Sequence, residues 1–247
     1  MRFKTVQASS FKAAFEVLKD ILNDVNIYFT SDGVRILTLD TARVALVDLE
    51  LQADNFEEYE CETPIVAGVN VTNTFKLLKT ISNSDTLTMD IKDKDSMEIF
   101  IENPTKKTNT KFKLKLLDID EDHIEVPHVP VTITTIMPSI DFQRICRDMN
   151  NLASELNISR DTDRLVISCK GDFADQETIV TCPDKIDTVC NGVYSLKYLN
   201  IFTKATGMCS NVQLMHEEQN RFLILQYNVA NLGEIKFYLA TKVDQDS

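Results

Sequence analysis

Short runs of alternating apolar and polar residues dominate the chain and predict a β-rich protein. Ten runs are rich in β-branched residues, whereas four longer stretches place their apolar residues at helical spacing. The expected strands are 34–40, 44–51, 86–92, 96–102, 110–117, 131–137, 164–171, 211–217, 222–229 and 235–241. The expected helices are 9–22, 71–83, 139–153 and 195–207. Antiparallel sheets with segregated helices, an α+β fold, account for this pattern.

The order of these elements repeats. In each half a leading helix is followed by strands, a second helix and further strands, and Phe11 and Phe142 hold similar places in the two leading helices. The segment "DIDEDHIEVPHVP" between the halves is acidic and contains two prolines, which is typical of a linker. We therefore expect two similar domains, residues 1–117 and 131–247, joined by a connecting linker over 118–130.

Each predicted helix carries two cations on one side, away from most of its apolar residues. Their spacings of seven or three residues bring side chains within about 60° of each other around a helix axis. The stretch 71–83 has Lys76 and Lys79 on a polar side without any acid, and Phe75 falls away from them. The eight cations are Lys12, Lys19, Lys76, Lys79, Arg144, Arg147, Lys197 and Lys204.

These cationic sides contrast with the charge of the whole chain, which has 26 basic and 38 acidic residues and a net charge of −12. If the sheets hold the helices side by side, the cations form a stripe that would meet phosphates without reading bases. Alternatively, they are ordinary solvated faces of amphipathic helices. No aromatic residue is expected on the cationic sides, so stacking on single strands is not indicated.

Little in the sequence favours an enzyme, a metal site or a membrane segment. The six cysteines form no C-x-x-C pair, only three histidines occur, and no phosphate-loop or hydrolase motif is present. The cluster Asp118, Asp120, Glu121 and Asp122 lacks the glycine-containing spacing of a calcium loop, so a solvated acidic loop is the simpler interpretation. We expect an intracellular chain with reduced thiols, without cofactor, metal or membrane span.

Several segments resemble the eukaryotic-type DNA sliding clamp, the proliferating cell nuclear antigen (PCNA) family. They are "FEVLKDILND" (15–24), "VAGVNVTNTFKLLK" (66–79), "LLDIDED" (116–122), "FQRICRDM" (142–149), "YLNIFTKAT" (198–206) and "IKFYLATKV" (235–243). The resemblance runs in order from residue 3 to about 243.

This resemblance implies a non-catalytic processivity factor, in which three identical protomers form a ring around duplex DNA. Sheets would lie outside and the four helices would line the hole, with the eight cations facing DNA. An ATP-dependent clamp loader would open the ring, which would tether DNA polymerase and other replication and repair enzymes. The expected location is the nucleus or a viral replication site. A clamp-like subunit acting as a monomer or in a mixed, checkpoint-type heterotrimeric ring is the alternative.

The resemblance also assigns a protomer interface to the strand "NTKFKLKLL" (109–117) and the segment "QETIVTC" (176–182) of the next protomer. By themselves, the alternating lysines of the first strand equally suit a guarded sheet edge. The interface residues implied by the resemblance are Lys111, Phe112, Lys113, Leu114, Glu177, Ile179 and Thr181.

A pocket for partner peptides is the last feature that the resemblance implies. Ile124, Val126 and Pro127 in the acidic linker could equally be anchors that hold the loop down. The implied pocket residues are Leu39, Arg43, Val44, Leu46, Ile124, Val126, Pro127, Phe222, Tyr238 and Ala240. The family has histidine at Arg43 and proline at Phe222 and Thr241, so partner preference is expected to differ here.

Two further departures from the family concern lysines. Ala13 replaces a family lysine in the first helix, which would make the lining slightly less positive. The loop "SRDTDR" (159–164) contains no lysine, and Thr162 stands at or beside the position of the family's ubiquitin-accepting lysine. Signalling through that loop is therefore not expected, and the chain would suit a DNA virus or a divergent eukaryote.

Overall fold

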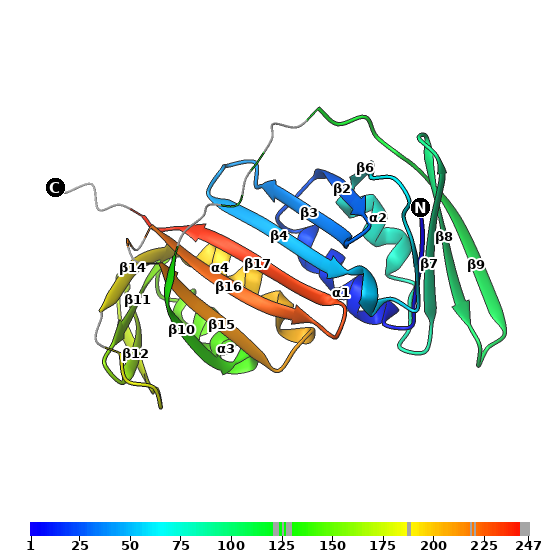
Figure 1. The fold of residues 1–247 in the computed structure, drawn as a ribbon. Helices are drawn as coiled ribbons and strands as arrows, with labels where there is room; N and C mark the ends of the chain where they lie inside the picture. Colours follow the sequence, from blue (N-terminus) through cyan, green and yellow to red (C-terminus); the bar gives the residue numbers. More distant parts are fainter. Residues whose placement is uncertain are drawn as a thin grey trace. The chain divides into compact units, whose positions relative to one another are not determined.

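The computed structural model of the 247-residue chain describes residues 1–120, 124, 126, 130–186, 189–217, 219 and 221–242. It divides into two compact units (Figure 1). Unit 1 comprises Met1–Thr41, Val47–Glu125 and Asn228–Ile235, and unit 2 comprises Ala42–Leu46, Val126–Tyr227 and Lys236–Ser247. The helices of the described residues are all too short or too polar to cross a membrane.

Unit 1 holds two antiparallel sheets and two helices. Its strands follow the hydrogen-bonded orders β5-β1-β7-β8-β9 and β4-β3-β2-β6. The elements are β1 (Arg2–Thr5), α1 (Ala8–Leu18), β2 (Asp24–Thr30), β3 (Gly33–Leu39), β4 (Ala45–Gln52), the 3-10 helix η1 (Ala53–Asn55), β5 (Glu58–Glu60), β6 (Ile65–Asn70), α2 (Val71–Leu78), β7 (Thr86–Asp93), β8 (Ser96–Asn103) and β9 (Thr108–Lys115).

Unit 2 repeats this plan, with strand orders β10-β15-β16-β17 and β13-β12-β11-β14. The elements are β10 (Val131–Pro138), α3 (Ser139–Met149), β11 (Glu155–Asp161), β12 (Arg164–Lys170), β13 (Asp175–Thr181), β14 (Cys190–Ser195), α4 (Leu196–Phe202), the 3-10 helix η2 (Thr203–Gly207), β15 (Asn211–Glu217), β16 (Phe222–Val229) and β17 (Gly233–Ala240). The expected α+β fold with four helices is confirmed.

Strands β4 and β17 are adjacent in the hydrogen-bonded order, and both units contain part of each. In unit 1, the Gln52 amide donates to the Leu232 carbonyl at 2.9 Å, and in unit 2 the Ala240 amide donates to the Val44 carbonyl at 3.1 Å. A Cβ on Gly233 would meet the Glu50 carbonyl oxygen at 2.0 Å, so only glycine allows this close approach.

Aromatic side chains fix the leading helix of unit 1 against its sheets. Phe11 and Phe15 of α1 are buried, and their rings stack with centroids 5.2 Å apart. The buried Phe3 ring lies 5.7 Å from Phe11 and 4.8 Å from Phe56. Burying large rings removes apolar area from water and stabilises both the helix and the sheet that it covers.

Buried aromatic side chains also fix the helices of unit 2. Phe142 of α3 and Phe202 of α4 are fully buried, and Phe202 stacks on Phe237 of β17 with centroids 4.5 Å apart. The side chain of Gln143 donates to the Thr203 carbonyl at 2.9 Å, which ties α3 to η2. The two helices are therefore held side by side over their sheet (Figure 1).

The predicted elements are mostly present, with systematic differences at helix ends. Each α-helix stops four or five residues before its predicted end, and residues 203–207 form a 3-10 helix. The residues just beyond α1, α2 and α3 make i to i−3 bonds, such as Ile21 amide to Leu18 carbonyl at 3.0 Å. The strands that the pattern did not predict are β1, β2, β5, β6, β11, β13 and β14.

Candidate functional site

Four of the predicted cations lie on, or directly after, the two helices of unit 1. Lys76 and Lys79 are exposed, whereas Lys12 and Lys19 are half-buried. The Lys12 ammonium donates to the Ile81 carbonyl at 2.7 Å, and Lys19 Nζ lies 2.9 Å from Asp20 Oδ1. The first contact ties α1 to the residues that follow α2, whereas the second lies within the segment that follows α1.

Local sequence explains why α2 begins where it does. The Asn70 side chain accepts from the Asn73 amide at 2.9 Å, which caps the first turn. Lys79 is the C-cap residue, where a cation is favoured by the partial negative charge of the helix end. Val71, Thr74 and Leu78 are buried, so the opposite side with Lys76 and Lys79 faces solvent.

The helical layer of unit 2 presents the other four cations, all exposed: Arg144, Arg147, Lys197 and Lys204. An Arg144 guanidinium nitrogen lies 3.1 Å from Asp141 Oδ1, and Arg147 Nε lies 3.6 Å from Asp148 Oδ1. Acids on the same helix therefore offset part of the α3 charge, as Asp20 does for Lys19. Exposed pairs of this kind are weak and can open when phosphates approach.

The expectation that aromatic rings avoid these cations is wrong at two positions. Lys19 Nζ lies 5.3 Å from the centroid of the half-buried Phe75 ring, on the neighbouring helix. Lys197 Nζ lies 6.0 Å from the centroid of Tyr198. Helical periodicity predicts side-chain directions within one helix only. It therefore does not predict the contact between Lys19 and Phe75, which packing between α1 and α2 creates.

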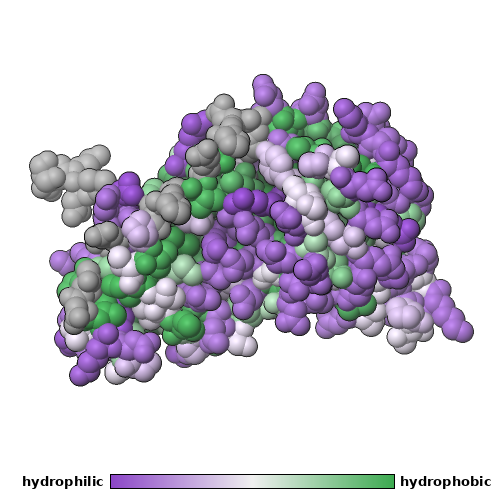
Figure 2. Space-filling view, in the orientation of Figure 1, coloured by the Kyte–Doolittle hydropathy of each residue, from purple (hydrophilic) through white to green (hydrophobic). Residues whose placement is uncertain are grey.

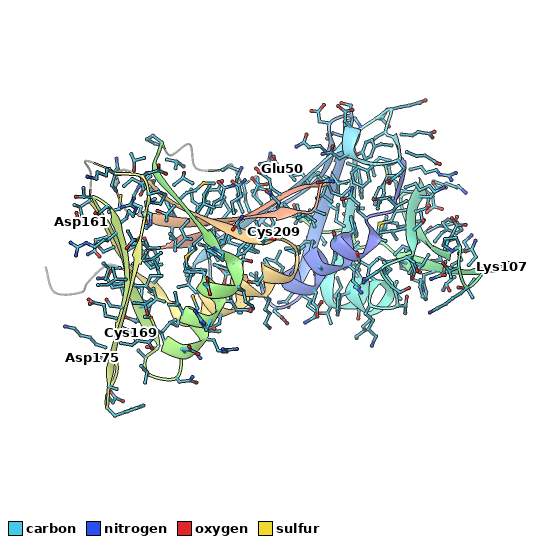
Figure 3. The ribbon with its side chains drawn as sticks, turned by 90° about the horizontal axis from the view of Figure 1, so that it is seen from below. Glu50, Lys107, Asp161, Cys169, Asp175 and Cys209 are labelled. Atoms are coloured by element: carbon cyan, nitrogen blue, oxygen red, sulfur yellow. The ribbon has the colours of Figure 1, made fainter. Side chains whose placement is uncertain are left out.

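The predicted interface strands are both sheet edges. Strand β9 is the last strand of its five-stranded sheet, and β13 is the first strand of its four-stranded sheet. Lys111 and Lys113 of β9 are exposed, as are Glu177, Ile179 and Thr181 of β13, whereas Phe112 and Leu114 are half-buried. Figure 3 labels Lys107 at the β8–β9 turn and Asp175 at the start of β13.

Electrostatic contacts already organise the β9 lysines. Lys111 Nζ lies 2.6 Å from Glu98 Oε1 on the neighbouring strand and 5.1 Å from the Phe100 ring centroid. The hydrogen bond from Lys111 lowers the pKa of Glu98, to which Lys92 also contributes. Lys111, Lys113 and Lys115 of this edge are all exposed. The face of the molecule in Figure 2 is largely hydrophilic.

The predicted pocket residues fall into three groups. Unit 2 contains Arg43, Val44, Leu46, Val126, Phe222, Tyr238 and Ala240. The Ala240 amide donates to the Val44 carbonyl at 3.1 Å. Leu39 and Ile124 belong to unit 1. Pro127 lies outside the described residues. Arg43 is exposed at a positive φ of 56°, and the Arg221 guanidinium lies 5.8 Å from the Phe222 ring centroid.

A buried polar group in unit 2 was not predicted. Arg160 is 2% exposed and donates to the Asp184 carbonyl at 2.6 Å, and His216 and Glu217 are buried beside it. Burial, together with the Arg160 charge, lowers the pKa of His216 to about 4. One sequence signal existed: Arg160 continues the inward positions of Leu156 and Ile158 on β11.

Two of the positions that were predicted to depart from the family are Thr162 and Ala13. Thr162 is part of the β11–β12 turn, and its amide bonds Asp161 Oδ1 at 2.7 Å. Ala13 is half-buried on α1, beside Lys12. Among the described residues, no group of three or more histidine, cysteine and carboxylate side chains could hold a metal ion.

Comparison with known proteins gives one consistent answer. Residues 1–124 match the family described as "Proliferating cell nuclear antigen, N-terminal domain", and residues 125–242 match its C-terminal domain. The "Probable DNA polymerase sliding clamp 1" of Paramecium bursaria Chlorella virus 1 is 39% identical over 249 aligned positions. That match covers 96% of this chain and 95% of the viral protein.

Proposed function

The chain belongs to the PCNA family of DNA polymerase sliding clamps, and from that membership we propose that it is a homotrimeric ring that encircles duplex DNA. The ring acts without catalysis, as a processivity factor that keeps DNA polymerase and other replication or repair enzymes at their template. The closed ring, and not tight binding to phosphates, would keep the protein on DNA.

The observation that carries this proposal is the placement of the eight cations on the helical layers of the two units. A chain with a net charge of −12 otherwise repels DNA, so charge alone would hold it weakly. Cations on the helices would contact phosphates at any sequence, as a sliding protein requires. The six exposed members of the set are Lys76, Lys79, Arg144, Arg147, Lys197 and Lys204.

Peptide partners are proposed to bind unit 2 at a pocket that Val44, Leu46, Tyr238 and Ala240 would line. Its apolar members would receive aliphatic and aromatic side chains, and the acids of 118–122 would favour basic flanks. Arg43 and Phe222 stand at its border, and we infer that they alter which peptides bind. An ATP-dependent loader places the ring on DNA in the nucleus or at a viral replication site.

Retention on DNA of different topology tests the proposal. The clamp is loaded onto nicked circular duplex, and half of the sample is then cut once with a restriction enzyme. We expect the protein to stay on the circle and to leave the linear molecule by sliding off its ends. Sedimentation should give three times the 28.1 kDa chain mass in the same buffer. Equal loss from both DNAs would refute enclosure, and a monomer mass would favour the clamp-like subunit instead.

A further inference from the structure

Unit 1 carries a groove of about 820 Å³ that contains none of the eight cations and none of the predicted pocket residues. Its walls are residues 63–66 at the start of β6, residues 91–95 at the β7–β8 turn and residues 116–118 after β9. Val66 is 55% exposed and Leu117 is 43% exposed. The groove therefore presents apolar surface within a concave site, which suits the side chains of a ligand.

The edge of β6 beside this groove is open. Strand β6 is the last strand of its sheet, where it follows β2. The Leu117 amide donates to the Gly68 carbonyl at 2.8 Å, so the backbone groups of Gly68 point away from β2. In an antiparallel strand, the backbone groups of alternate residues point to the same side. The amide and carbonyl of Val66 therefore also point away from β2, on the side of the groove that Val66 lines.

The segment that follows β9 covers this edge at Gly68 and then leaves it. Gly68 and Leu117 form an isolated bridge, and the Ile119 carbonyl accepts from the Asn26 side chain of β2 at 3.2 Å. Within the described residues, the outward amide and carbonyl of Val66 have no hydrogen-bond partner. An open edge of this kind can accept an extended chain as a further strand.

The charges around the groove indicate the chemistry of its ligand. Two lysines and three aspartates line it, and all five are exposed. Lys92 Nζ lies 3.4 Å from Asp90 Oδ2 and 3.6 Å from Glu98 Oε2, so acids outside the groove already offset its charge. Lys94 is left against the three aspartates, and this excess of acid favours a positively charged ligand. The aspartates are Asp93, Asp95 and Asp118.

We propose that this groove binds an extended basic segment of a partner protein, which adds to the open edge of β6 as a further strand. The segment forms main-chain hydrogen bonds with the amide and carbonyl of Val66. Its aliphatic side chains contact Val66 and Leu117, and its lysines or arginines approach the aspartates. The inference goes beyond the proposed function, because it requires neither the ring nor the peptide pocket of unit 2.

Other classes of ligand fit the groove less well. Phosphates of a nucleic acid would meet the excess of aspartates. A helix bonds its own amides internally, so it would leave the backbone groups of Val66 unpaired. The bridge at Gly68 and the missing amide of Pro64 also limit the new strand to a few residues. We therefore expect binding that is weak and exchanges rapidly.

Neutralising two of the aspartates tests the charge requirement. The probe is a fluorescein-labelled peptide of sequence KVKVKVK, and its anisotropy is measured with the full chain at low salt. D93N/D95N should weaken binding roughly fivefold, because two attractive charges are lost while the asparagine oxygens remain as acceptors. D32N/D54N, which removes two acids of unit 1 outside the groove, is the matched control. Equal loss in both variants would overturn the assignment to the groove.

Methylated peptides test strand addition on the unaltered chain. Alternate amides of an extended peptide point to the same side, so only one set can face β6. One version of the probe is N-methylated at its valines and another at its lysines, which keeps the charges and side chains of both. We expect one version to bind roughly tenfold more weakly and the other to bind like the unmethylated probe. Equal behaviour of the two versions would overturn pairing with β6.

Substitution of Val66 tests the same contact from the side of the protein. Val66→Pro removes the outward amide without removing a bond to β2, and proline is tolerated at such edges. It should weaken probe binding roughly tenfold, whereas Val66→Ala, which keeps the amide, should lose less. Circular dichroism checks folding. If Val66→Pro does not fold, the methylated peptides still decide.

Hydrogen exchange locates the bound probe. The Val66 amide should exchange more slowly in the complex, whereas the Ala67 amide, which points toward β2, should not change. Protection that appears elsewhere and not at Val66 would overturn the inference.

The outcomes separate this inference from the proposed function. Phe222→Ala, which alters the border of the unit 2 pocket, should bind the probe like the wild-type chain. If Phe222→Ala loses binding and D93N/D95N does not, the probe occupies the unit 2 pocket and the groove is excluded. A chain that binds the probe at Val66 but leaves circular and linear DNA equally fast would refute the ring and leave this inference intact.

Discussion

At the scale of single residues, the buried His216 makes the stability of the folded chain depend on pH. The side chain is fully buried, and its ring nitrogens have no hydrogen-bond partner among the described residues. Because burial and Arg160 lower its pKa to about 4 from near 6.5, the unfolded chain binds the proton more readily than the folded chain. This contribution to stability is complete above pH 6.5 and is lost as the pH falls toward 4.

We therefore expect His216→Leu to reduce the acid sensitivity of unit 2. Between pH 7 and pH 4, the wild-type chain should lose about 3 kcal/mol more unfolding free energy than the variant, following the difference in pKa. At pH 7 the variant should be at least as stable, because an apolar side chain replaces a buried polar ring. Urea unfolding at several pH values measures both effects. Parallel pH profiles for the two chains would show that His216 does not titrate with folding.

Single residues also show what sequence reading can supply. The inward position of Arg160 follows from its alternation with Leu156 and Ile158, so burial of that cation was predictable. The contact of Lys19 with Phe75 was not, because the two residues lie on different helices. Periodicity gives the direction of a side chain from its own element, and only packing gives its neighbours from others.

At the scale of elements, the cap of α2 controls one cationic surface. Asn70 accepts from the Asn73 amide and donates to Asp24 at 2.7 Å, so it joins the helix start to β2. Asn70→Ala should lower the unfolding free energy by about 1 kcal/mol, because an amide of the first turn loses its acceptor. Asn70→Ser, which keeps a capping oxygen, should recover most of this loss. Thermal unfolding of the three chains measures it, and equal loss in both variants would instead implicate the Asp24 contact.

Element boundaries explain most differences between the predicted and observed fold. The helices end early because their final predicted turns close through i to i−3 bonds, which hydrophobic periodicity does not distinguish from helix. Strand β6 was missed because its interior contains Gly68. A Cβ there would meet the Leu117 carbonyl oxygen at 2.3 Å, so the glycine serves a contact far along the chain. Such close approaches cannot be inferred from local composition.

At the scale of the whole molecule, the repeated plan carries more information than any single site. The order of elements predicted two similar halves. Two hydrogen bonds extend that similarity to individual residues: the Ala53 amide after β4 donates to the Asp32 carbonyl before β3, and the Cys182 amide after β13 donates to the Asp163 carbonyl before β12. The cationic helix sides were likewise predictable from spacing. The function of these cationic sides was not predictable from spacing, because it depends on the copies and ligands that assemble around them.

Reversal of the exposed α2 cations tests that use. Lys76→Glu and Lys79→Glu together should weaken binding of a short duplex roughly tenfold at low salt, because two phosphate contacts become repulsive. Both side chains are exposed at the helix surface, so folding and sedimentation mass should not change. Fluorescence anisotropy at rising salt concentration measures binding, with K92E/K94E as the charge-matched control.

If the control loses as much affinity as the α2 variant, net charge and not the helix surface governs contact with DNA. If the α2 variant dissociates into single chains, these lysines belong to an interface between copies. A selective loss with an unchanged mass would support the assignment of α2 to the DNA-facing side of the ring.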